Sequence, residues 1–334
     1  MGALPIVYYT HWCPDDGPDL LLGHAEVVRA SGDRTPSHDE IVARAHGATA
    51  LCFFVPDLIN AALIARLPNL RVLASFGKGY DNVDVAAATA RGIWVTNVPG
   101  ALTEATADLA WGLMLGLARY VVPGDAEVRA RAFSGWHPKA LLGASVHGKR
   151  LGIIGFGEIG RAIARRATGF AMSVSYYDIA RAERDVEQEY GASYFPFDDI
   201  LRLSDFVLLA TPLTERTHGM IGAREVGLMK SHAYLINIGR GSVVNEAAVA
   251  AALERRAIAG YAADVFAFED RQYHDHPAYV DPILLAHRDR TVFTPHLGTA
   301  VLEDRRALSL SQATSVLEVL NGKRPRAAVN APLG

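Results

Sequence analysis

Short apolar runs alternate with stretches of helical periodicity along most of the chain. Each run is only a few residues long, which suits a buried strand better than a helix. The runs lie at residues 5–9, 50–55, 71–75, 93–96, 151–154, 173–177, 206–211, 233–238, 260–266 and 291–293. Helices are expected at residues 38–46, 59–64, 159–168, 182–190 and 246–255. Strands that alternate with helices predict an α/β protein whose parallel sheets are covered on both faces.

Two longer helices are expected to decide how the chain divides. Residues 103–120 are apolar on nearly every side, so this helix should be buried against a sheet and against a second subunit. Another long helix should begin near Thr299 and return to the first sheet. Its candidate core residues are Leu308, Leu310, Val316 and Val319. Residues 1–100 and 299–334 are thus expected to form one domain, with residues 101–298 inserted as another and residues 121–149 as a polar connection.

Composition and charge exclude several classes of function. A length of 334 residues suits about two domains, and a formal net charge of −3 gives no basic surface for nucleic acid. The two cysteines, Cys13 and Cys52, indicate a reducing compartment and no disulfide framework. The longest uncharged apolar run, 109–118, is too short to cross a membrane, and no secretory signal is visible. We therefore expect a cytoplasmic protein that binds neither membrane nor nucleic acid.

A glycine-rich turn is the first sign of chemistry. Residues 151–160 read LGIIGFGEIG, in which Gly155, Gly157 and Gly160 have the spacing G-x-G-x-x-G. The first glycine allows a tight turn, the second lets the backbone approach a pyrophosphate, and the third lets the next helix pack on the sheet. Asp178 lies about 20 residues further on, where a ribose 2′-hydroxyl needs an acceptor. The pattern predicts NAD binding; Asp178 should disfavour NADP, and Arg181 could weaken that preference.

Three further side chains follow predicted strands of the same domain. Arg240, Glu269 and His296 come after the runs 233–238, 260–266 and 291–293. Because ligands bind outside the carboxyl ends of parallel strands, the three should gather in one cleft. A histidine can give or take a hydroxyl proton, a carboxylate behind it fixes its tautomer, and an arginine holds an anion. Together they predict hydride transfer between a nicotinamide and a small anion, although each alone could be a structural residue.

Several segments resemble the D-isomer-specific 2-hydroxyacid dehydrogenases, in that family's order. They are the glycine turn and residues 77–82 (GKGYDN), 103–108 (TEATAD), 238–241 (IGRG), 263–266 (ADVF) and 294–296 (TPH). The resemblance covers the whole chain and implies Arg240, Glu269 and His296 as catalytic residues. It implies two doubly wound parallel-sheet domains, a Rossmann cofactor domain inserted into a flavodoxin-like substrate domain. It also implies a homodimer built on the helix that begins near Thr103.

The same resemblance implies which residues bind the cofactor. Besides the three glycines, they are Thr106, Glu158, Ile159, Asp178, Thr211, Pro212, Ile238, Asp264 and Gly298, with Asp264 near the carboxamide. The cofactor would be NAD, and NADP stays possible.

One position departs from the common pattern of the family. The loop at 77–82 carries Lys78 where a small apolar residue is usual, and in the family this loop presents its N–H groups to the substrate. An unpaired lysine in a closed cleft is costly, so it predicts a substrate with more negative charge, such as phosphite. Segments 77–82, 260–266 and 269–290 are similar to phosphite (phosphonate) dehydrogenases. That resemblance implies Lys78, Gly79, Arg240, Trp136 and Arg305 as substrate-binding residues.

Other positions favour other interpretations. Val55, Leu141 and Ala267 depart from the phosphite pattern, and residues 97–105 look more like glyoxylate and hydroxypyruvate reductases. Lys78 could also pair with a nearby carboxylate as a structural ion pair. A small 2-keto acid therefore stays open as the substrate. An alternative of another class is an NAD-sensing binding protein resembling the corepressor C-terminal binding protein, although the trio of Arg240, Glu269 and His296 favours turnover.

Overall fold

The computed structural model describes residues 3–30, 32, 34–273 and 276–332. The chain folds into two compact units, which are described separately below. Unit 1 consists of Met1–Leu102 and Thr299–Gly334, and unit 2 consists of Thr103–Gly298. The expected domain boundaries lie close to these bounds, and the roles assigned to the two domains stay a prediction.

Unit 1 is built on a parallel five-stranded sheet in the order β2-β1-β3-β4-β5. Its strands are β1 (Ile6–Tyr9), β2 (Glu26–Arg29), β3 (Ala48–Phe53), β4 (Val72–Ser75) and β5 (Trp94–Thr96). This is the flavodoxin-like order, in which the strand sequence reverses between β1 and β3. The sheet confirms the fold class expected for this part of the chain.

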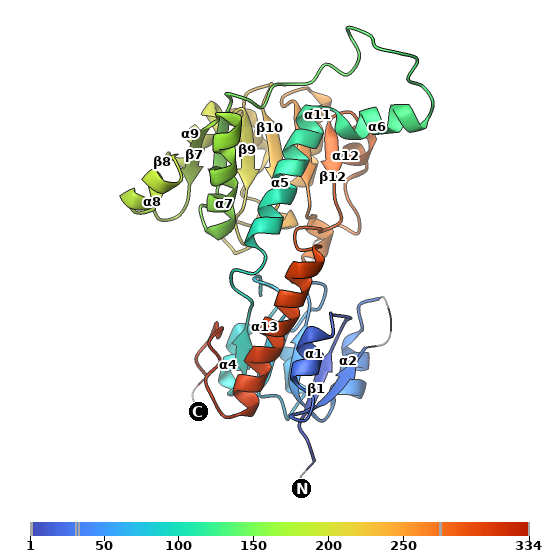
Figure 1. Cartoon of the computed structure of the whole chain (residues 1–334), viewed down its shortest axis with the longest axis vertical. Helices are drawn as coiled ribbons and strands as arrows, with labels where there is room; N and C mark the ends of the chain where they lie inside the picture. Colours follow the sequence, from blue (N-terminus) through green and yellow to red (C-terminus); the bar gives the residue numbers. More distant parts are fainter. Residues whose placement is uncertain (1–2, 31, 33, 274–275, 333–334) are drawn as a thin grey trace. The chain divides into compact units, whose positions relative to one another are not determined.

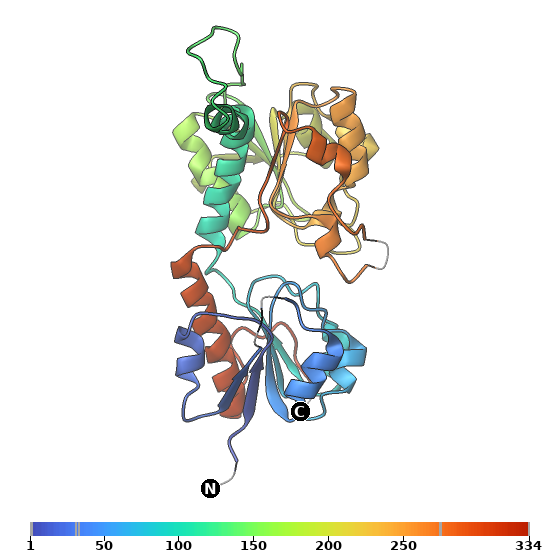
Figure 2. The ribbon, with the colours of Figure 1, turned by 90° about the vertical axis from the view of Figure 1, so that its right-hand side faces the viewer.

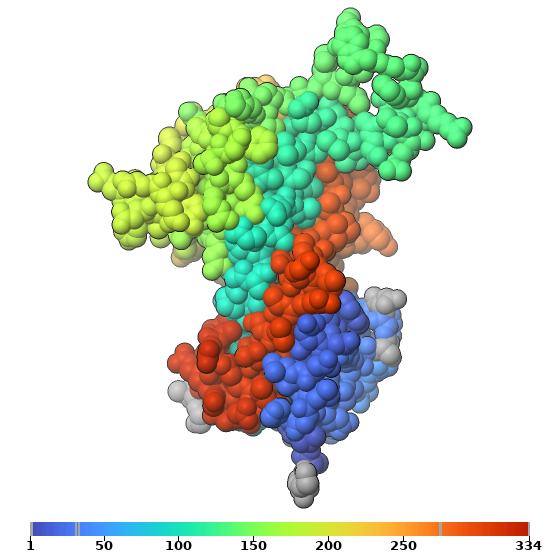
Figure 3. Space-filling view, viewed as in Figure 1, coloured from blue at the N-terminus to red at the C-terminus, as the bar shows by residue number. Residues whose placement is uncertain are grey.

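Helices cover both faces of the unit 1 sheet (Figure 2). On one face lie α2 (His38–Ala45), α3 (Ala61–Ala65) and α4 (Val85–Ala90), which share an apolar core with the strands. On the other lie α1 (Asp16–Leu20) and α13 (Leu302–Leu320), which pack against each other. Figure 3 shows the first and last parts of the chain side by side there.

The return of α13 to the first sheet confirms the expected long helix. Buried Gln312 donates from Nε2 to the carbonyl oxygen of Ala74 on β4 at 2.8 Å. Leu308, Val316 and Val319 are buried, as expected. The prediction for Leu310 was wrong, because its side chain is 42% exposed. Leu310 lies two positions after Leu308, which on a helix places it on a different side.

Unit 2 is built on a parallel seven-stranded sheet in the order β12-β11-β10-β9-β6-β7-β8. Its strands are β6 (Arg150–Ile154), β7 (Ser173–Tyr177), β8 (Ala192–Tyr194), β9 (Phe206–Leu209), β10 (Tyr234–Asn237), β11 (Gly260–Ala263) and β12 (Thr291–Phe293). The strand order from β8 to β11 is that of the Rossmann fold, with β12 added at the edge. The fold class expected for this unit is confirmed.

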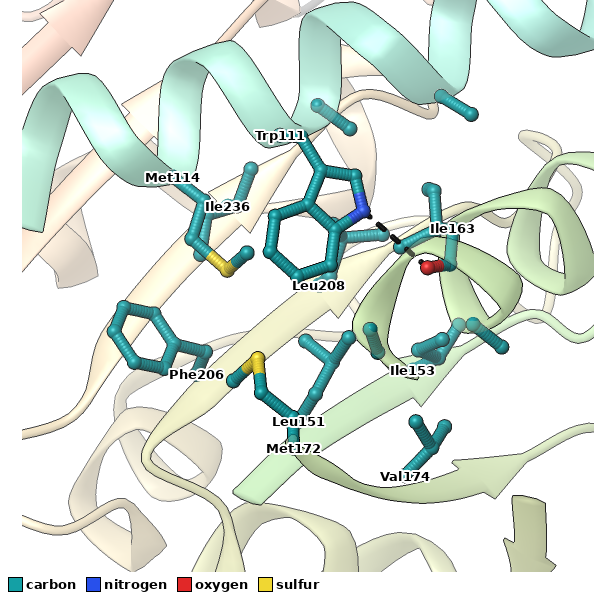
Figure 4. Packing of buried hydrophobic residues seen from close by; sticks show 14 of the residues in the cluster. Trp111, Met114, Leu151, Ile153, Ile163, Met172, Val174, Phe206, Leu208 and Ile236 are labelled. Carbon is teal, nitrogen blue, oxygen red and sulfur yellow. Dashed lines mark hydrogen bonds between the residues drawn. The ribbon is translucent and has the colours of Figure 1, made fainter. Parts of the chain in front are cut away.

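Helices also cover both faces of the unit 2 sheet (Figure 1). On one face α5 (Thr103–Ala118) and α7 (Glu158–Ala167) pack on alternate strand residues such as Leu151 and Ile153. There Trp111 donates from Nε1 to the carbonyl oxygen of Ile163 at 3.3 Å (Figure 4). The other face carries α9 (Phe197–Leu203), α10 (Ala223–Leu228), α11 (Glu246–Glu254) and α12 (Pro282–Ala286), and α8 (Arg184–Glu189) precedes β8.

Two strands and several short helices have no counterpart among the expected elements. β2 reads EVVR, so charged residues flank its two valines, and β8 has only three residues. Neither strand contains an apolar run long enough to stand out. The prediction of a polar connection at 121–149 was wrong at its start, where α6 (Val121–Arg129) forms.

The surroundings of α5 change the reason for expecting a dimer. Trp111, Leu113, Met114 and Leu117 are all buried within unit 2 itself. A second subunit is therefore not needed to cover these side chains. Among the described residues, every helix is too short or too polar to traverse a bilayer. Cytoplasmic location stays a prediction.

Candidate active site

The glycine turn between β6 and α7 has the shape that a dinucleotide requires. Gly155 has a φ of +97°, and a Cβ there would lie 2.6 Å from the carbonyl oxygen of Ala210. A Cβ on Gly160 would lie 2.2 Å from the carbonyl oxygen of Gly155, so α7 packs too closely for a side chain. A Cβ on Gly157 would meet nothing within 4 Å. The turn is thus tight against the protein at two glycines and open at the third.

The N-terminus of α7 supplies the donors for a phosphate. Gly157 is its N-cap and provides no side-chain acceptor. The N–H groups of the first turn, which include Glu158, Ile159 and Gly160, have no acceptor within the helix. With the positive end of the helix dipole they form an anion site beside the open face of Gly157. The residues present therefore fit the pyrophosphate of NAD(P), as expected.

Asp178 lies beside this turn, directly after β7. Its Oδ2 accepts a hydrogen bond from the backbone N–H of Phe156 at 2.7 Å, and its Oδ1 accepts one from the N–H of Ile179 at 2.7 Å. These bonds fix the carboxylate against the glycine turn and leave acceptor capacity on both oxygens. The position suits the ribose role expected for Asp178.

Thr106, Asp264 and Gly298 are tied together. Thr106 donates from Oγ1 to the carbonyl oxygen of Gly298 at 3.1 Å, and the N–H of Gly298 donates to Oδ2 of Asp264 at 2.8 Å. Oδ1 of Asp264 accepts from Thr294 Oγ1 at 2.6 Å and from the N–H of Leu297 at 2.7 Å. Burial raises the pKa of Asp264, because the charged form loses water. Asp264 thereby holds the loop after β12 in place.

The remaining expected cofactor residues surround the same strand ends. A Cβ on Gly239 would lie 2.5 Å from the carbonyl oxygen of Thr211, so the segments after β9 and β10 touch. The hydroxyl oxygen of Thr211 is buried without a hydrogen-bond partner among the described residues, and Ile238 is buried. An orphaned hydroxyl at this edge is a group that a ligand can satisfy. Pro212, by contrast, is exposed.

The structure joins two of the three expected catalytic residues directly. Nδ1 of His296 lies 2.7 Å from Oε2 of Glu269, and both side chains are partly exposed. Oε1 of Glu269 accepts from the backbone N–H of Phe266 at 2.7 Å. The carboxylate is therefore held from behind, and it fixes the imidazole so that Nε2 remains for a substrate. This geometry suits an acid–base histidine.

His296 sits in an uncommon backbone conformation. Its φ is +55°, while its N–H donates to the carbonyl oxygen of Asp264 at 2.8 Å. A left-handed conformation at a residue with a Cβ costs roughly 1–2 kcal/mol. The bonds of Asp264 to Leu297 and Gly298 hold this turn, so the position of the imidazole depends on β11 as well as β12.

Arg240 lies on the loop after β10, which packs against the loop that carries Glu269. A Cβ on Gly241 would lie 1.8 Å from the carbonyl carbon of Phe266, so only glycine fits between the two loops. Asn237 donates from Nδ2 to the carbonyl oxygen of Arg240 at 2.9 Å, which fixes the backbone there. The structure thus brings the loops of Arg240, Glu269 and His296 to one edge of the unit 2 sheet.

The expected substrate residues Lys78, Gly79 and Arg305 belong to unit 1. Ser75 donates from Oγ to the carbonyl oxygen of Gly79 at 3.1 Å, and Asn97 donates from Nδ2 to that of Lys78 at 2.9 Å, so the loop is well fixed. The guanidinium carbon of Arg305 lies 5.7 Å from the centre of the Phe76 ring. Burial lowers the pKa of Arg305.

The structure weakens the argument for two of the expected substrate-binding residues, Lys78 and Trp136. Lys78 is not without a partner, so the argument from an unpaired lysine loses its premise. Trp136 is 85% exposed and belongs to the loop after α6, which lies beyond the C-terminal end of α5 (Figure 1). The structure does not bring Trp136 to the other candidate residues of unit 2.

A second histidine–carboxylate pair, in unit 1, was not expected from the sequence. Nε2 of His11 lies 3.2 Å from Oδ1 of Asp57, whose side chain is buried. The His11 ring meets the edge of Phe54 with centroids 5.4 Å apart, and Phe54 stacks on Phe76 at 4.6 Å. Arg305, which lies over the Phe76 ring, is the last member of this row of contacting side chains. A signal was available, because Asp57 is an acid two positions after the apolar run 50–55.

Comparison with known proteins identifies the family. The family model described as D-isomer specific 2-hydroxyacid dehydrogenase, NAD binding domain, matches residues 111–298. A glyoxylate reductase from Pyrococcus furiosus is 40% identical over 330 residues, which is 98% of this chain and 95% of the relative. The phosphite dehydrogenases implied by the Lys78 loop are not supported by these matches.

Solved structures agree over the whole chain. The TT0316 protein from Thermus thermophilus has a TM-score of 0.86 and 34% identity, covering 97% of this chain and 100% of that one. An NADPH-dependent glyoxylate/hydroxypyruvate reductase from Sinorhizobium meliloti, in complex with NADP and malonate, has a TM-score of 0.85 and 28% identity, covering 98% and 97%. This chain therefore belongs to the D-isomer-specific 2-hydroxyacid dehydrogenase family and is an NAD(P)-dependent oxidoreductase.

Proposed function

We propose that this protein reduces glyoxylate, or a closely similar small 2-keto acid, to the 2-hydroxy acid with NADH. The observation that carries the proposal is the hydrogen bond between His296 and Glu269 at the strand edge that also holds the glycine turn. The likeness to a glyoxylate reductase over nearly the whole chain supports this substrate, as does the segment 97–105.

Each residue has a defined task in this reaction. The chemistry that a bound NAD(P)H would supply is a hydride for the carbonyl carbon of the substrate. His296 donates a proton from Nε2 to the carbonyl oxygen, and Glu269 stabilises the imidazolium form before that step. Arg240 binds the carboxylate of the substrate and orients it. Asp178 binds the ribose hydroxyls and favours NADH over NADPH.

Phosphite oxidation is the second candidate, because the loop at 77–82 matches phosphite dehydrogenases around Lys78. In that reaction His296 would take a proton from water, whose oxygen attacks phosphorus as hydride passes to NAD. We place this candidate second, since Lys78 already has a partner and Val55 departs from the phosphite pattern.

One pair of assays tests the proposal. Purified protein is mixed with NADH and glyoxylate, or with NAD and phosphite, and the nicotinamide absorbance is followed. We expect rapid loss of NADH with glyoxylate and little change with phosphite. Faster turnover of phosphite would reverse the order of the two candidates. No turnover with either anion, or with hydroxypyruvate, would favour the NAD-sensing binding protein.

We also propose a homodimer, formed through the segment that follows α5. This segment, the arm, comprises α6 and the loop at 130–145 and carries several exposed apolar side chains. They are Val121, Val122, Val128, Phe133, Trp136, Leu141 and Leu142. So many apolar side chains on one segment are typical of a protein interface. A second copy of the chain is the occupant that the family resemblance implies.

A further inference from the structure

Glu187 of α8 forms a closed set of bonds with β7 and with the loop that follows Asp178. Its side chain is only 10% exposed. Oε1 accepts from Arg181 Nε at 2.8 Å and from the Tyr176 hydroxyl at 2.8 Å, and Oε2 accepts from Arg181 Nη2 at 2.8 Å. The Tyr176 hydroxyl in turn accepts from the N–H of Ala182 at 2.9 Å. Glu187 thus fastens the loop after β7 to the strand itself.

Arg181 is the residue that this arrangement restrains. It lies three positions after Asp178, on the loop where dinucleotide-binding folds place the group that meets the ribose 2′ position. An arginine there accommodates the 2′-phosphate of NADP, whereas an acid binds the free 2′-hydroxyl of NAD. Here Arg181 donates two parallel N–H···O bonds to the carboxylate of Glu187, which is the strongest geometry available to a guanidinium. The Tyr194 ring lies 6.0 Å from its guanidinium carbon and adds a further contact.

We propose that Glu187 is a specificity-determining residue that favours NADH by withholding Arg181 from the 2′-phosphate of NADPH. This inference rests on the proposed use of NADH and names the residue that produces this preference. Asp178 stays in place for the ribose, fixed by the N–H groups of Phe156 and Ile179. An arginine near Asp178 in the sequence therefore does not soften the preference for NAD.

The electrostatics of Glu187 agree with a firm ion pair. Arg181 and, to a smaller extent, the Tyr176 hydroxyl lower the pKa of Glu187 to about 2. The carboxylate is charged at neutral pH, so its hold on Arg181 persists there. Asp178 takes its hydrogen bonds from backbone N–H groups instead, so it does not compete with Glu187 for the guanidinium.

The test measures dissociation constants of NADH and NADPH by their fluorescence, without any substrate. Glu187→Gln keeps the shape and the acceptor for Tyr176 but loses the charge that holds Arg181. We expect NADPH to bind about tenfold more tightly to this variant and NADH to change by less than about twofold. In Arg181→Ala/Glu187→Gln the gain should disappear, because the freed cation is gone. Tyr176→Phe is the matched control, since it removes the other partner of Glu187 and leaves Arg181 held, so NADPH affinity should stay unchanged.

A second variant keeps the test decisive if Glu187→Gln folds poorly. Arg181→Ala alone would leave the carboxylate of Glu187, which is 10% exposed, without its cation. Arg181→Ala/Glu187→Gln avoids that charge, and because Arg181 is already withheld in the wild type, we expect the double variant to bind NADPH with wild-type affinity. Weaker NADPH binding in the double variant than in the wild type, or unchanged NADPH binding in Glu187→Gln, would overturn the inference. The readout is binding alone, so failure of glyoxylate turnover would sink the proposed function and leave this result standing.

Discussion

His296, the proposed acid–base residue, shows how far neighbouring residues decide the position of a side chain. Its imidazole is aimed by Glu269, and its left-handed backbone is held by the bonds of Asp264 to the residues that follow. The sequence was sufficient to propose Arg240, Glu269 and His296 as catalytic residues, because each follows an apolar run in a domain with a glycine turn. It could not reveal that Asp264 fixes the turn of His296, since that depends on contacts between residues far apart in the chain.

We predict that Glu269→Gln lowers the turnover number for glyoxylate by roughly 10²–10⁴-fold, the usual worth of acid–base catalysis. A glutamine can still accept from the N–H of Phe266, but it cannot stabilise an imidazolium. The dissociation constant of NADH should stay within about twofold of the wild-type value. Steady-state rates and NADH fluorescence measure the two quantities.

Glu246→Gln is the matched control for that variant. Glu246 is buried near the turn of Glu269, where its Oε1 accepts from the N–H of Ala267 at 2.8 Å. Burial raises its pKa, because the charged form loses water, and a glutamine keeps the acceptor for the N–H of Ala267. Turnover should therefore survive in Glu246→Gln. A Glu269→Gln enzyme as fast as the wild type would remove Glu269 from the proton-transfer step.

At the scale of elements, period and run length were reliable where a strand contains an apolar run. The segments 173–177 and 291–293 were predicted at the bounds that β7 and β12 have in the structure. These signals fail at β2, which carries charged ends, and at β8, which reads ASY and contains no apolar run. They also fail at α6, none of whose residues is buried, so that it carries no burial signal. Tertiary packing decides such elements, and a single sequence does not encode it locally.

The glycine turn leads to a prediction that compares two substitutions of the same size. Gly157→Ala adds a methyl group that meets no protein atom within 4 Å, so stability should fall by about 1 kcal/mol or less. Gly160→Ala places the methyl group 2.2 Å from the carbonyl oxygen of Gly155, so we expect a loss of about 1–3 kcal/mol. Thermal unfolding measures both effects.

Binding of NADH should separate the two variants further. In Gly157→Ala the methyl group occupies the space beside the helix N-terminus, so we expect NADH to bind at least about tenfold more weakly in a protein that is otherwise intact. In Gly160→Ala weaker binding should accompany the lost stability. Normal NADH affinity in Gly157→Ala would contradict the placement of the pyrophosphate.

At the scale of the whole molecule, the unexplained feature is the arm after α5. The side chains of α5 that first suggested a dimer are covered by the sheet and α7 of the same unit, whereas those of the arm are exposed. A single chain with this apolar surface in water would tend to associate. The partner need not be a different protein, because a surface that meets its own copy across a two-fold axis buries every member twice.

We therefore predict that light scattering finds a particle of twice the mass of the 334-residue chain. Val122→Glu/Val128→Glu should convert it to a single chain, because two buried charges on each side cost several kcal/mol when they are unpaired. Both valines are more than half exposed in the isolated chain, so the variant should fold normally. Ile179→Glu, at an exposed position outside the arm, is the control and should leave the mass unchanged. A wild-type protein that scatters as one chain at micromolar concentration would show that the arm has some other occupant.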